Sequence, residues 1–374
     1  MGEPNHYPWL DWLRFAAALM VLVGHARGTF LIEFGGLPSE QKEPLVAIAY
    51  ALTRLGHEAV VVFFVLSGYL VAGRTARRVA TNDFRLADYS LDRCTRVFLP
   101  YLPALLFTWA CAASVGDSPE VKSFLYNLLC LQGVFGESFG GNAPLWSIAY
   151  EFWFYVLAGS LGEFWRSRGN NRVRTTLALL TTGTCFVLFT ILSSTYLFCW
   201  ILGGMASCLP QLRRSLVVAA VAAVVGAVIA IQAQFGSLSI DTTHWATKLP
   251  RMPVLELIMA GSVGVILNQL IRLTPRSTLA KRLDQLGSRM ASFSYTLYLV
   301  HYPVLAVTAF YWLPRSDRIS MKSVGSLLVG CTISVCVALV FFYLFERNTS
   351  RLRHWVRDRG KLTKGGRRSA DHLK

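Results

Sequence analysis

Charged residues are scarce in this sequence. Only 16% of its 374 residues are Asp, Glu, Lys or Arg, and 53% are hydrophobic, whereas an average soluble domain carries about 25% charged residues. This shortage argues against an ordinary soluble protein of this length. Acidic residues are the rarer kind, 21 against 37 basic ones, which gives a net charge of +16. Such a charge occurs in nucleic-acid-binding proteins, so the placement of the basic residues has to decide its meaning.

The chain also lacks several motifs that mark common functions. Its eight cysteines include no Cys-x-x-Cys pair and lie mostly inside apolar runs, so we predict no zinc ribbon, no disulfide framework and no bound metal. No phosphate-binding G-x-x-x-x-G-K-[ST] motif and no G-x-S-x-G turn is present. The N-terminus has no basic segment or small-residue cleavage site. We therefore expect the first apolar run to be retained as a membrane helix rather than removed as a signal peptide.

Long apolar runs, by contrast, recur along the whole chain. A helix needs about 20 predominantly apolar residues to cross the hydrocarbon core of a bilayer. Ten runs approach this length: 9–26, 58–73, 97–114, 144–161, 175–192, 195–209, 215–234, 253–271, 291–312 and 323–345. The second and sixth are short. The pattern predicts an all-α, multi-pass integral membrane protein with about ten transmembrane helices.

Lysine and arginine are distributed unevenly among the segments between these runs. If the N-terminus is cytoplasmic, 27 of the 37 lysines and arginines fall in the cytoplasmic segments and nine in the outer ones. Cytoplasmic loops of membrane proteins carry such an excess. The distribution predicts that both termini are cytoplasmic. It also indicates that the positive charge reflects membrane topology, so we expect no nucleic-acid partner.

Two regions outside the predicted membrane helices have a distinct composition. Residues 44–55, PLVAIAYALTRL, lie in a long outer loop and are suited to an amphipathic helix in the membrane interface. Residues 347–374 are rich in Arg and Lys. We expect them to form a basic, disordered cytoplasmic tail near anionic lipid. The transmembrane domain would then span residues 1–346.

Three ionisable residues lie in the first run, LDWLRFAAALMVLVGHA (10–26): Asp11, Arg14 and His25. Such groups are costly inside a bilayer and normally have a partner or a role. At about 100° per residue, Arg14 and His25 point the same way and lie about 16 Å apart along the helix axis. Asp11 falls within about 60° of Arg14. Snorkelling can serve Asp11 and Arg14 but not His25, which favours a functional role for His25 over a structural hydrogen bond.

The next two candidate positions allow more than one interpretation. Ser67-Gly68 interrupts the second run, where small residues permit close helix packing, a local break or a substrate contact. Arg93 and Arg96 lie one turn apart at a predicted membrane boundary. They indicate either positive-inside anchoring or a phosphate clamp, since paired guanidinium groups suit phosphate oxygens. The residues by themselves leave both readings open.

Two later runs each carry a further ionisable residue. Glu151 lies in the aromatic-rich stretch APLWSIAYEFWFYVL (143–157). It is suited to general acid/base chemistry, to orienting a histidine, or to a buried structural hydrogen bond. His301 lies in SYTLYLVHYPVLAV (294–307), just before Pro303. A structural and a functional role are equally compatible with that position.

Five stretches together resemble the membrane-bound acyltransferase-3 family. They are LDWLRFAAALMVLVGH, FFVLSGYL, RCTRVFLPY, LWSIAYEFWFY and YTLYLVHYPV, which follow that family's order at similar spacing over residues 9–345. There are departures. Valines precede Phe63-Phe64 where many members have a polar residue, and Asn348 stands where proline is common. The SGNH hydrolase-like domain that follows the last helix in some members is absent from this sequence.

The resemblance implies an integral membrane O-acyltransferase of the bacterial cytoplasmic (inner) membrane. Such proteins move an acyl group, usually acetyl, from cytoplasmic acyl-CoA to a carbohydrate hydroxyl. The implied partners are acetyl-CoA as acyl donor, the lipid bilayer, and an exopolysaccharide, O-antigen or lipo-oligosaccharide as acceptor. By motif, Arg14 and His25 match the family's essential pair, and Arg93 and Arg96 match its acyl-CoA-associated arginines. Glu151 matches the acidic position of the fourth-helix motif. For substrate contact or support we also expect Asp11, Ser67, Tyr69, Trp146, Tyr150 and His301, which lie in the same stretches.

On this basis we expect the three arginines to bind acyl-CoA. His25, tuned by Glu151, would either deprotonate the acceptor hydroxyl or carry the acyl group transiently. Two other functions also fit the residues. One is a secondary transporter in which the intramembrane Asp, Arg, His and Glu form a proton or substrate pathway. The other is a glycan flippase that performs no chemistry.

Overall fold

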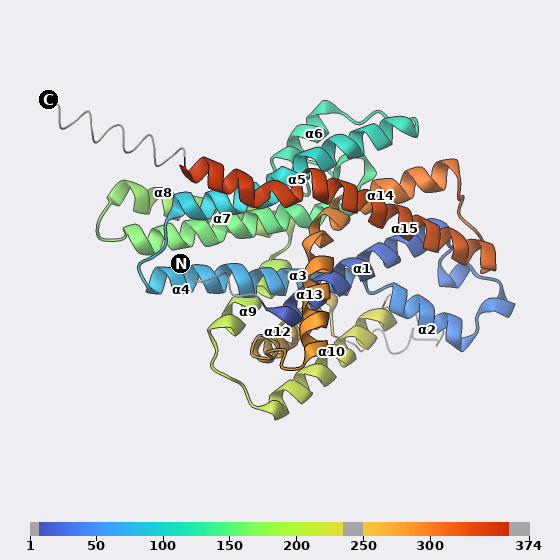
Figure 1. Cartoon of the computed structure of the whole chain (residues 1–374), viewed down its shortest axis with the longest axis horizontal. Coiled ribbons are helices and arrows are strands. Elements are labelled where there is room, and N and C mark those ends of the chain that lie inside the picture. Colours follow the sequence, from blue (N-terminus) through green and yellow to red (C-terminus); the bar gives the residue numbers. More distant parts are fainter. Residues whose placement is uncertain (1–6, 235–249, 359–374) are drawn as a thin grey trace.

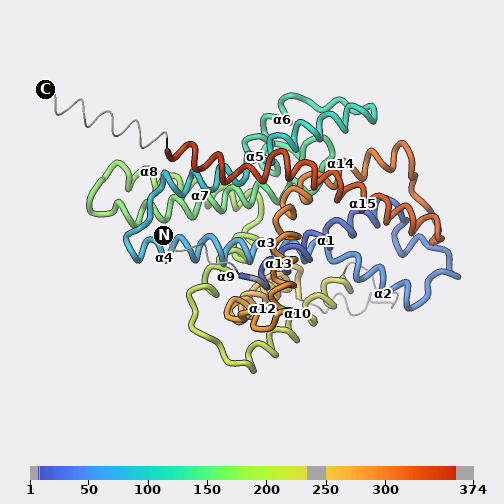
Figure 2. Tube along the Cα trace, in the orientation of Figure 1, coloured from blue at the N-terminus to red at the C-terminus, as the bar shows by residue number. Residues whose placement is uncertain are grey.

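The structure, a computed structural model, describes residues 7–234 and 250–358, and helices make up most of both ranges (Figures 1 and 2). Within these ranges the only β-type pairings are two isolated bridges, so the all-α prediction is confirmed. The main helices are α1 (Pro8–Phe30), α2 (Pro44–Thr53), α3 (Gly56–Ser67), α4 (Gly73–Ala80), α5 (Leu86–Ser114), α6 (Val121–Leu128), α7 (Trp146–Ser167), α8 (Arg172–Leu192), α9 (Ser194–Cys208), α10 (Arg214–Gln234), α12 (Met252–Leu270), α13 (Thr278–Ser292), α14 (Ser294–Tyr311) and α15 (Met321–Leu344).

Fewer helices qualify as membrane spans than the ten predicted. Within the described residues, seven are long and apolar enough to cross a membrane, or eight if α13 and α14, which meet at a 48° bend, form one span. The predicted fourth and sixth spans correspond to α7 and α9. Helix α9 has only 15 residues, and α7 contains three charged residues as well as Trp and Tyr. The structure therefore supports a multi-pass membrane protein with a smaller number of clear spans.

The two regions of distinct composition are both helical where they are described. Helix α2 corresponds to the predicted interface helix, and it exposes Leu45, Ile48 and Leu52 on one face. After α15 the chain passes through a 3-10 turn, η6 (Glu346–Asn348), into a helix that reaches Asp358. The start of the predicted tail is thus helical rather than disordered. Residues 359–374 lie outside the described residues.

Helix α1 occupies the centre of the bundle (Figure 1). It packs against α3 and also against α13, α14 and α15. Helix α3 packs in turn on α9 and α12, whereas α14 packs on α5 and α15. One helix with three ionisable residues therefore joins two groups of helices, and both groups can contribute to a site along α1.

Close backbone contact fixes the second predicted span against α9. A Cβ added at Gly68 would lie 1.9 Å from the carbonyl oxygen of Trp200, and one at Gly203 would lie 2.1 Å from that of Val65. Small residues allow helix backbones to approach this closely. The helix also widens here into a π-helical turn, η3 (Gly68–Ala72), a feature often found at functional sites. Close packing and a local break, two of the roles predicted for this sequence, both occur.

Two polar pairs, one partly buried and one buried, connect the other end of α3 to its neighbours. His57 Nε2 lies 2.6 Å from Glu256 Oε1 on α12. Gln232 on α10 donates from Nε2 to Glu58 Oε1 at 2.8 Å. These partners are far apart in the sequence, and the motifs gave no sign of them. They satisfy groups that would otherwise be costly inside a membrane.

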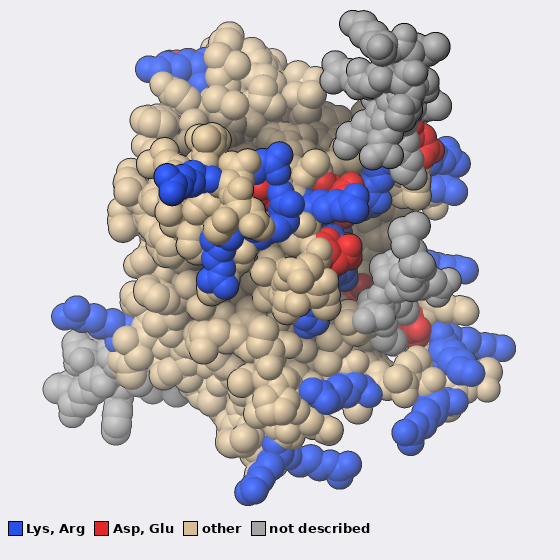
Figure 3. Space-filling view, turned by 90° about the vertical axis from the view of Figure 1, so that its left-hand side faces the viewer, with Lys and Arg blue, Asp and Glu red and all other residues tan. Residues whose placement is uncertain are grey.

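Lysine and arginine gather at one end of the bundle. Figure 3 views the end that carries the α7–α8 turn, the end of α4 and the C-terminal helix, and basic side chains are spread over this face with a few acidic ones among them. These segments belong to the regions that the Lys/Arg distribution predicted to be cytoplasmic. The side of a membrane on which this face lies stays a prediction.

Candidate active site

A cavity of about 600 Å³ opens between α1, α3 with its π-helical turn, α5, α7, α14 and the chain after α15. This volume is within the range of about 300–1,000 Å³ typical of ligand pockets. Among its lining residues, six arginines outnumber four acidic residues. The charged lining residues are Asp11, Arg14, Arg74, Asp92, Arg93, Arg96, Glu151, Glu346, Arg347 and Arg353.

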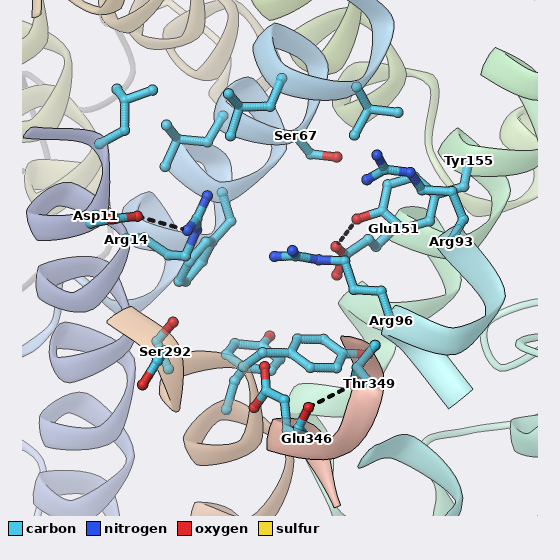
Figure 4. Close-up of a pocket in the computed structure, with 18 of the residues that line it drawn as sticks. Asp11, Arg14, Ser67, Arg93, Arg96, Glu151, Tyr155, Ser292, Glu346 and Thr349 are labelled. Carbon is cyan, nitrogen blue, oxygen red and sulfur yellow. Dashed lines mark hydrogen bonds and ion pairs between the residues drawn. The ribbon is translucent and has the colours of Figure 1, made fainter. Parts of the chain in front are cut away.

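Arg14 and Arg96 approach the cavity from opposite walls (Figure 4). Arg14 Nη1 lies 3.1 Å from Asp11 Oδ1, so these two residues, which share one face of α1, form an ion pair. Arg96 is exposed because it borders the cavity, and no hydrogen bond or ion pair holds it within residues 7–234 and 250–358. Asp11 is the one carboxylate within ion-pair distance of either guanidinium among the described residues, although Glu151 and Glu346 also line the cavity, so the two arginines retain donors for an anion between them.

Arg93 extends the positive wall beside Arg96. Its Cζ lies 5.7 Å from the ring centroid of Tyr89 and 5.3 Å from that of Tyr155, distances at which cation–π attraction operates. Its Nε is buried and has no hydrogen-bond partner in the described part of the chain. The two rings hold the guanidinium by its face and leave its N–H donors for a ligand. Of the two interpretations of Arg93 and Arg96, positive-inside anchoring and a phosphate clamp, this arrangement favours the clamp.

Glu151 and Glu346 are held at the cavity wall by hydroxyl groups. The Tyr155 hydroxyl donates to Glu151 Oε1, and Glu346 accepts from the hydroxyl of Thr296 and, at 3.3 Å, from its backbone N–H. The expected contact between Glu151 and His25 does not occur among the described residues. Glu151 belongs to the arginine-lined cavity, and the environment of His25 is built by other groups.

His25 and His301 do not line the cavity but face each other. Their ring centroids are 5.3 Å apart, and the Tyr302 ring lies 5.1 Å from that of His25. The nearest link to the cavity is Tyr298, which lines it and lies 6.0 Å from the His301 ring. Ser147 fixes the Tyr298 hydroxyl at 2.7 Å. The histidine pair therefore lies just beyond the inner end of the cavity.

The hydrogen bonds of His301 assign its tautomer. Its Nδ1 lies 2.9 Å from the carbonyl oxygen of Leu297, and because a carbonyl only accepts, Nδ1 carries the proton. Nε2 then bears a lone pair. This atom is buried without a partner in the described residues, and His301 is 1% exposed. An unpartnered imidazole nitrogen of this kind is chemically able to accept a proton.

The remaining predicted site residues divide between the cavity and its support. Ser67 points into the cavity just before the π-helical turn (Figure 4). Tyr69 is buried within that turn, at 4% exposure, and does not line the cavity. Trp146 and Tyr150 also stand behind the wall, with ring centroids 6.0 and 5.6 Å from that of the lining residue Phe64. Their geometry suits positioning rather than ligand contact.

Several lining residues were missed by sequence reasoning. Tyr155 follows Glu151 by four residues on one helix face, a spacing that by itself predicts contact. Arg353 and Asp92 pair across 261 positions, so no local pattern could have indicated them. Arg74 and Arg347 appeared only as two more basic residues of cytoplasmic segments.

Comparisons with known proteins fit this site. The family model for an acyltransferase domain, acyltransferase-3, matches residues 7–343. The chain belongs to the acyltransferase-3 family. The chain is also 24% identical over 163 residues to an O-acetyl transferase of Shigella phage Sf6, and the match covers 40% of this chain and 44% of that relative. The chain thus spans less than half the length of the relative it matches. No solved structure matches the acyltransferase significantly.

Proposed function

We propose that this acyltransferase moves an acetyl group from acetyl-CoA, bound from the cytoplasm, to a hydroxyl of a carbohydrate. The acceptor would be an exopolysaccharide, an O-antigen or a lipo-oligosaccharide, and the enzyme would lie in the bacterial cytoplasmic membrane. The similarity to a phage O-acetyl transferase supports acetyl as the group transferred. The excess of arginines in the cavity supports an anionic donor.

The observation that carries this proposal is the position of the arginine-lined cavity next to the histidine pair. Along α3, the π-helical turn and the start of α4, the lining residues run from Val60 to Arg74, a stretch of about 21 Å of helix. Tyr298, close to His301, lies at the inner end, and the arginines lie toward the Lys/Arg-rich face. This elongated shape suits a donor with charged phosphates at one end and a reactive thioester at the other.

Two routes for the acyl group are compatible with the geometry. In both, we assign the proton acceptor to His301 rather than to His25, the base expected from the sequence, because His301 Nε2 has no partner among the described residues. In direct transfer, the acceptor oxygen attacks the thioester carbonyl carbon, its proton passes to His301 Nε2, and the carbon–sulfur bond breaks. The CoA thiolate leaves and takes up the proton. In the relay, a ring nitrogen of His25 attacks first and releases CoA, and the acceptor oxygen then displaces the imidazole. His301 again receives the acceptor's proton.

Two measurements test the proposal. Mass spectrometry of surface glycans with and without the gene should reveal an added acetyl mass that depends on the gene. If the relay operates, a His25→Ala variant should abolish that mass, and a variant that acetylates its glycan at the normal rate would contradict the relay. Direct transfer would be contradicted by a His301→Asn variant that acetylates its glycan at the normal rate.

Isothermal titration of the purified protein with acetyl-CoA distinguishes an acyltransferase from a secondary transporter or a glycan flippase. Binding by the wild type supports the acyltransferase. A transporter or a flippase predicts no acetyl-CoA binding, and a transporter predicts flux that depends on an ion gradient.

A further inference from the structure

The segment after α15 forms part of the cavity wall. Five of its residues line the cavity, namely Glu346, Arg347, Thr349, Ser350 and Arg353. Arg347 is exposed and Arg353 is partly exposed, so both guanidinium groups can reach a ligand that enters from the Lys/Arg-rich face. None of the five motifs of the sequence includes this segment.

Ion pairs to the start of α5 hold the segment in place. Arg353 Nη1 lies 3.3 Å and Arg357 Nη2 lies 3.2 Å from the same oxygen of Asp92, and Arg357 Nε lies 3.7 Å from Asp88 Oδ1. One carboxylate oxygen thus serves two guanidinium groups. A phosphate offers three acceptor oxygens and a larger charge, so it is the stronger partner for the same donors.

The other cations at this end have no carboxylate partner. Arg74 and Arg347 make no ion pair within the residues that the structure describes, although both line the cavity. Arg74 lies in α4, which continues the chain beyond α3 and the π-helical turn, on the side away from His301. Arg74, Arg347 and Arg353 thus line the same cavity as Arg14 and Arg96, whose side chains face each other in Figure 4, and the neighbouring charge with the largest effect on Arg74 is that of Arg93.

We infer that Arg74, Arg347 and Arg353 form a subsite for the nucleotide phosphates of acyl-CoA, with Asp92 as the group that the phosphates displace from Arg353. This inference rests on the proposed donor and extends it, because it assigns recognition of the nucleotide to the segment after α15. The acyl-pantetheine arm then occupies the inner part of the cavity. The subsite makes the enzyme distinguish acyl-CoA from a thioester that lacks the nucleotide.

The assignment is tested by measuring, for each protein, the KM for two acyl donors, acetyl-CoA and acetyl-pantetheine. For Arg353→Gln, we expect KM for acetyl-CoA to rise about 10- to 100-fold, the effect of losing one charge-assisted hydrogen bond. KM for acetyl-pantetheine should stay within about twofold of the wild type, since one lost contact outside a substrate's reach has little effect. Retained turnover of acetyl-pantetheine also demonstrates that the variant is folded. The matched control is Arg351→Gln, because Arg351 is exposed on the same helix and does not line the cavity.

Two results would overturn the inference. One is an equal KM change for both donors in Arg353→Gln, and the other is an Arg351→Gln variant that discriminates between the donors as strongly. A second variant, Asp92→Asn, should lower the Kd for acetyl-CoA, because it removes the competitor of the phosphates. An unchanged or higher Kd contradicts the role given to Asp92. If wild-type protein uses neither donor, the proposed function itself has failed, which is a distinguishable outcome.

Discussion

Replacing His301 by asparagine isolates the chemistry of one buried atom. The asparagine amide nitrogen can occupy the place of Nδ1 and still donate to the Leu297 carbonyl oxygen, which lies 2.9 Å away in the native protein. Nothing then stands where Nε2 lies, next to His25. The substitution keeps the anchoring hydrogen bond and removes the proton acceptor.

The expected loss can be placed between two limits. A positioned general base contributes about 10²- to 10⁴-fold to a rate, which is about 2.7–5.5 kcal/mol of activation free energy. If His301 only filled space, the cost would be in the free energy of unfolding, about 1–3 kcal/mol for a residue that is 1% exposed, with little change in kcat for the folded fraction. We therefore expect kcat to fall at least about 100-fold.

The assay is transfer of radiolabelled acetyl from acetyl-CoA to the acceptor glycan, with the purified enzyme in proteoliposomes. The melting temperature of each variant is recorded in parallel, so that loss of fold is separated from loss of chemistry. His301→Ala leaves space for an imidazole, and added imidazole should restore part of its rate. The control is Tyr302→Phe, which keeps an aromatic ring against His25 and should respond to imidazole no more than the wild type does.

Two outcomes would refute this reasoning. If His301→Asn transfers acetyl at the wild-type rate, the unpartnered Nε2 has no catalytic role. If imidazole accelerates His301→Ala no more than the control, the side chain supports the fold rather than the reaction.

Three further predictions concern the donor site and the fold. Arg96→Gln should raise the Kd for acetyl-CoA about 10- to 100-fold in calorimetry. Arg96→Lys should restore only part of the affinity, because lysine lacks the planar fork of arginine. Equal binding by the wild type and both variants would exclude Arg96 from the donor site. Raising the salt concentration should raise the Kd for acetyl-CoA more than that for acetyl-pantetheine, because ions screen charge pairs at the open cavity; parallel salt dependences would contradict an arginine-bound nucleotide. Gly68→Ala should lower the free energy of unfolding by about 1–3 kcal/mol through overpacking, since its Cβ would lie 1.9 Å from the Trp200 carbonyl oxygen. The control Gly183→Ala, with nothing within 4 Å of its Cβ, should leave the melting temperature in detergent unchanged or higher. Equal effects of the two substitutions would contradict the α3–α9 contact.

The sequence by itself determined the features that depend on neighbours along the chain. Apolar runs and helical periodicity fixed the all-α membrane architecture. The three-residue spacing of Asp11 and Arg14 fixed their ion pair, and five ordered motifs pointed to the family. The count of about ten spans stays a prediction: within the described residues seven or eight helices are long and apolar enough to cross a membrane, and α9, for example, is apolar but has only 15 residues.

Only the tertiary structure decided which distant residues meet. His25 and His301 lie on helices from opposite ends of the chain, and Arg353 reaches Asp92 across 261 positions. Such contacts depend on how helices cross, which is set by close packing at points such as Gly68 against Trp200. The pattern of one helix records which face is apolar, but not which helix covers it. The motifs therefore named the histidines and several cavity arginines, whereas the contact between the histidines and the pairing of Arg353 with Asp92 depend on the packed bundle.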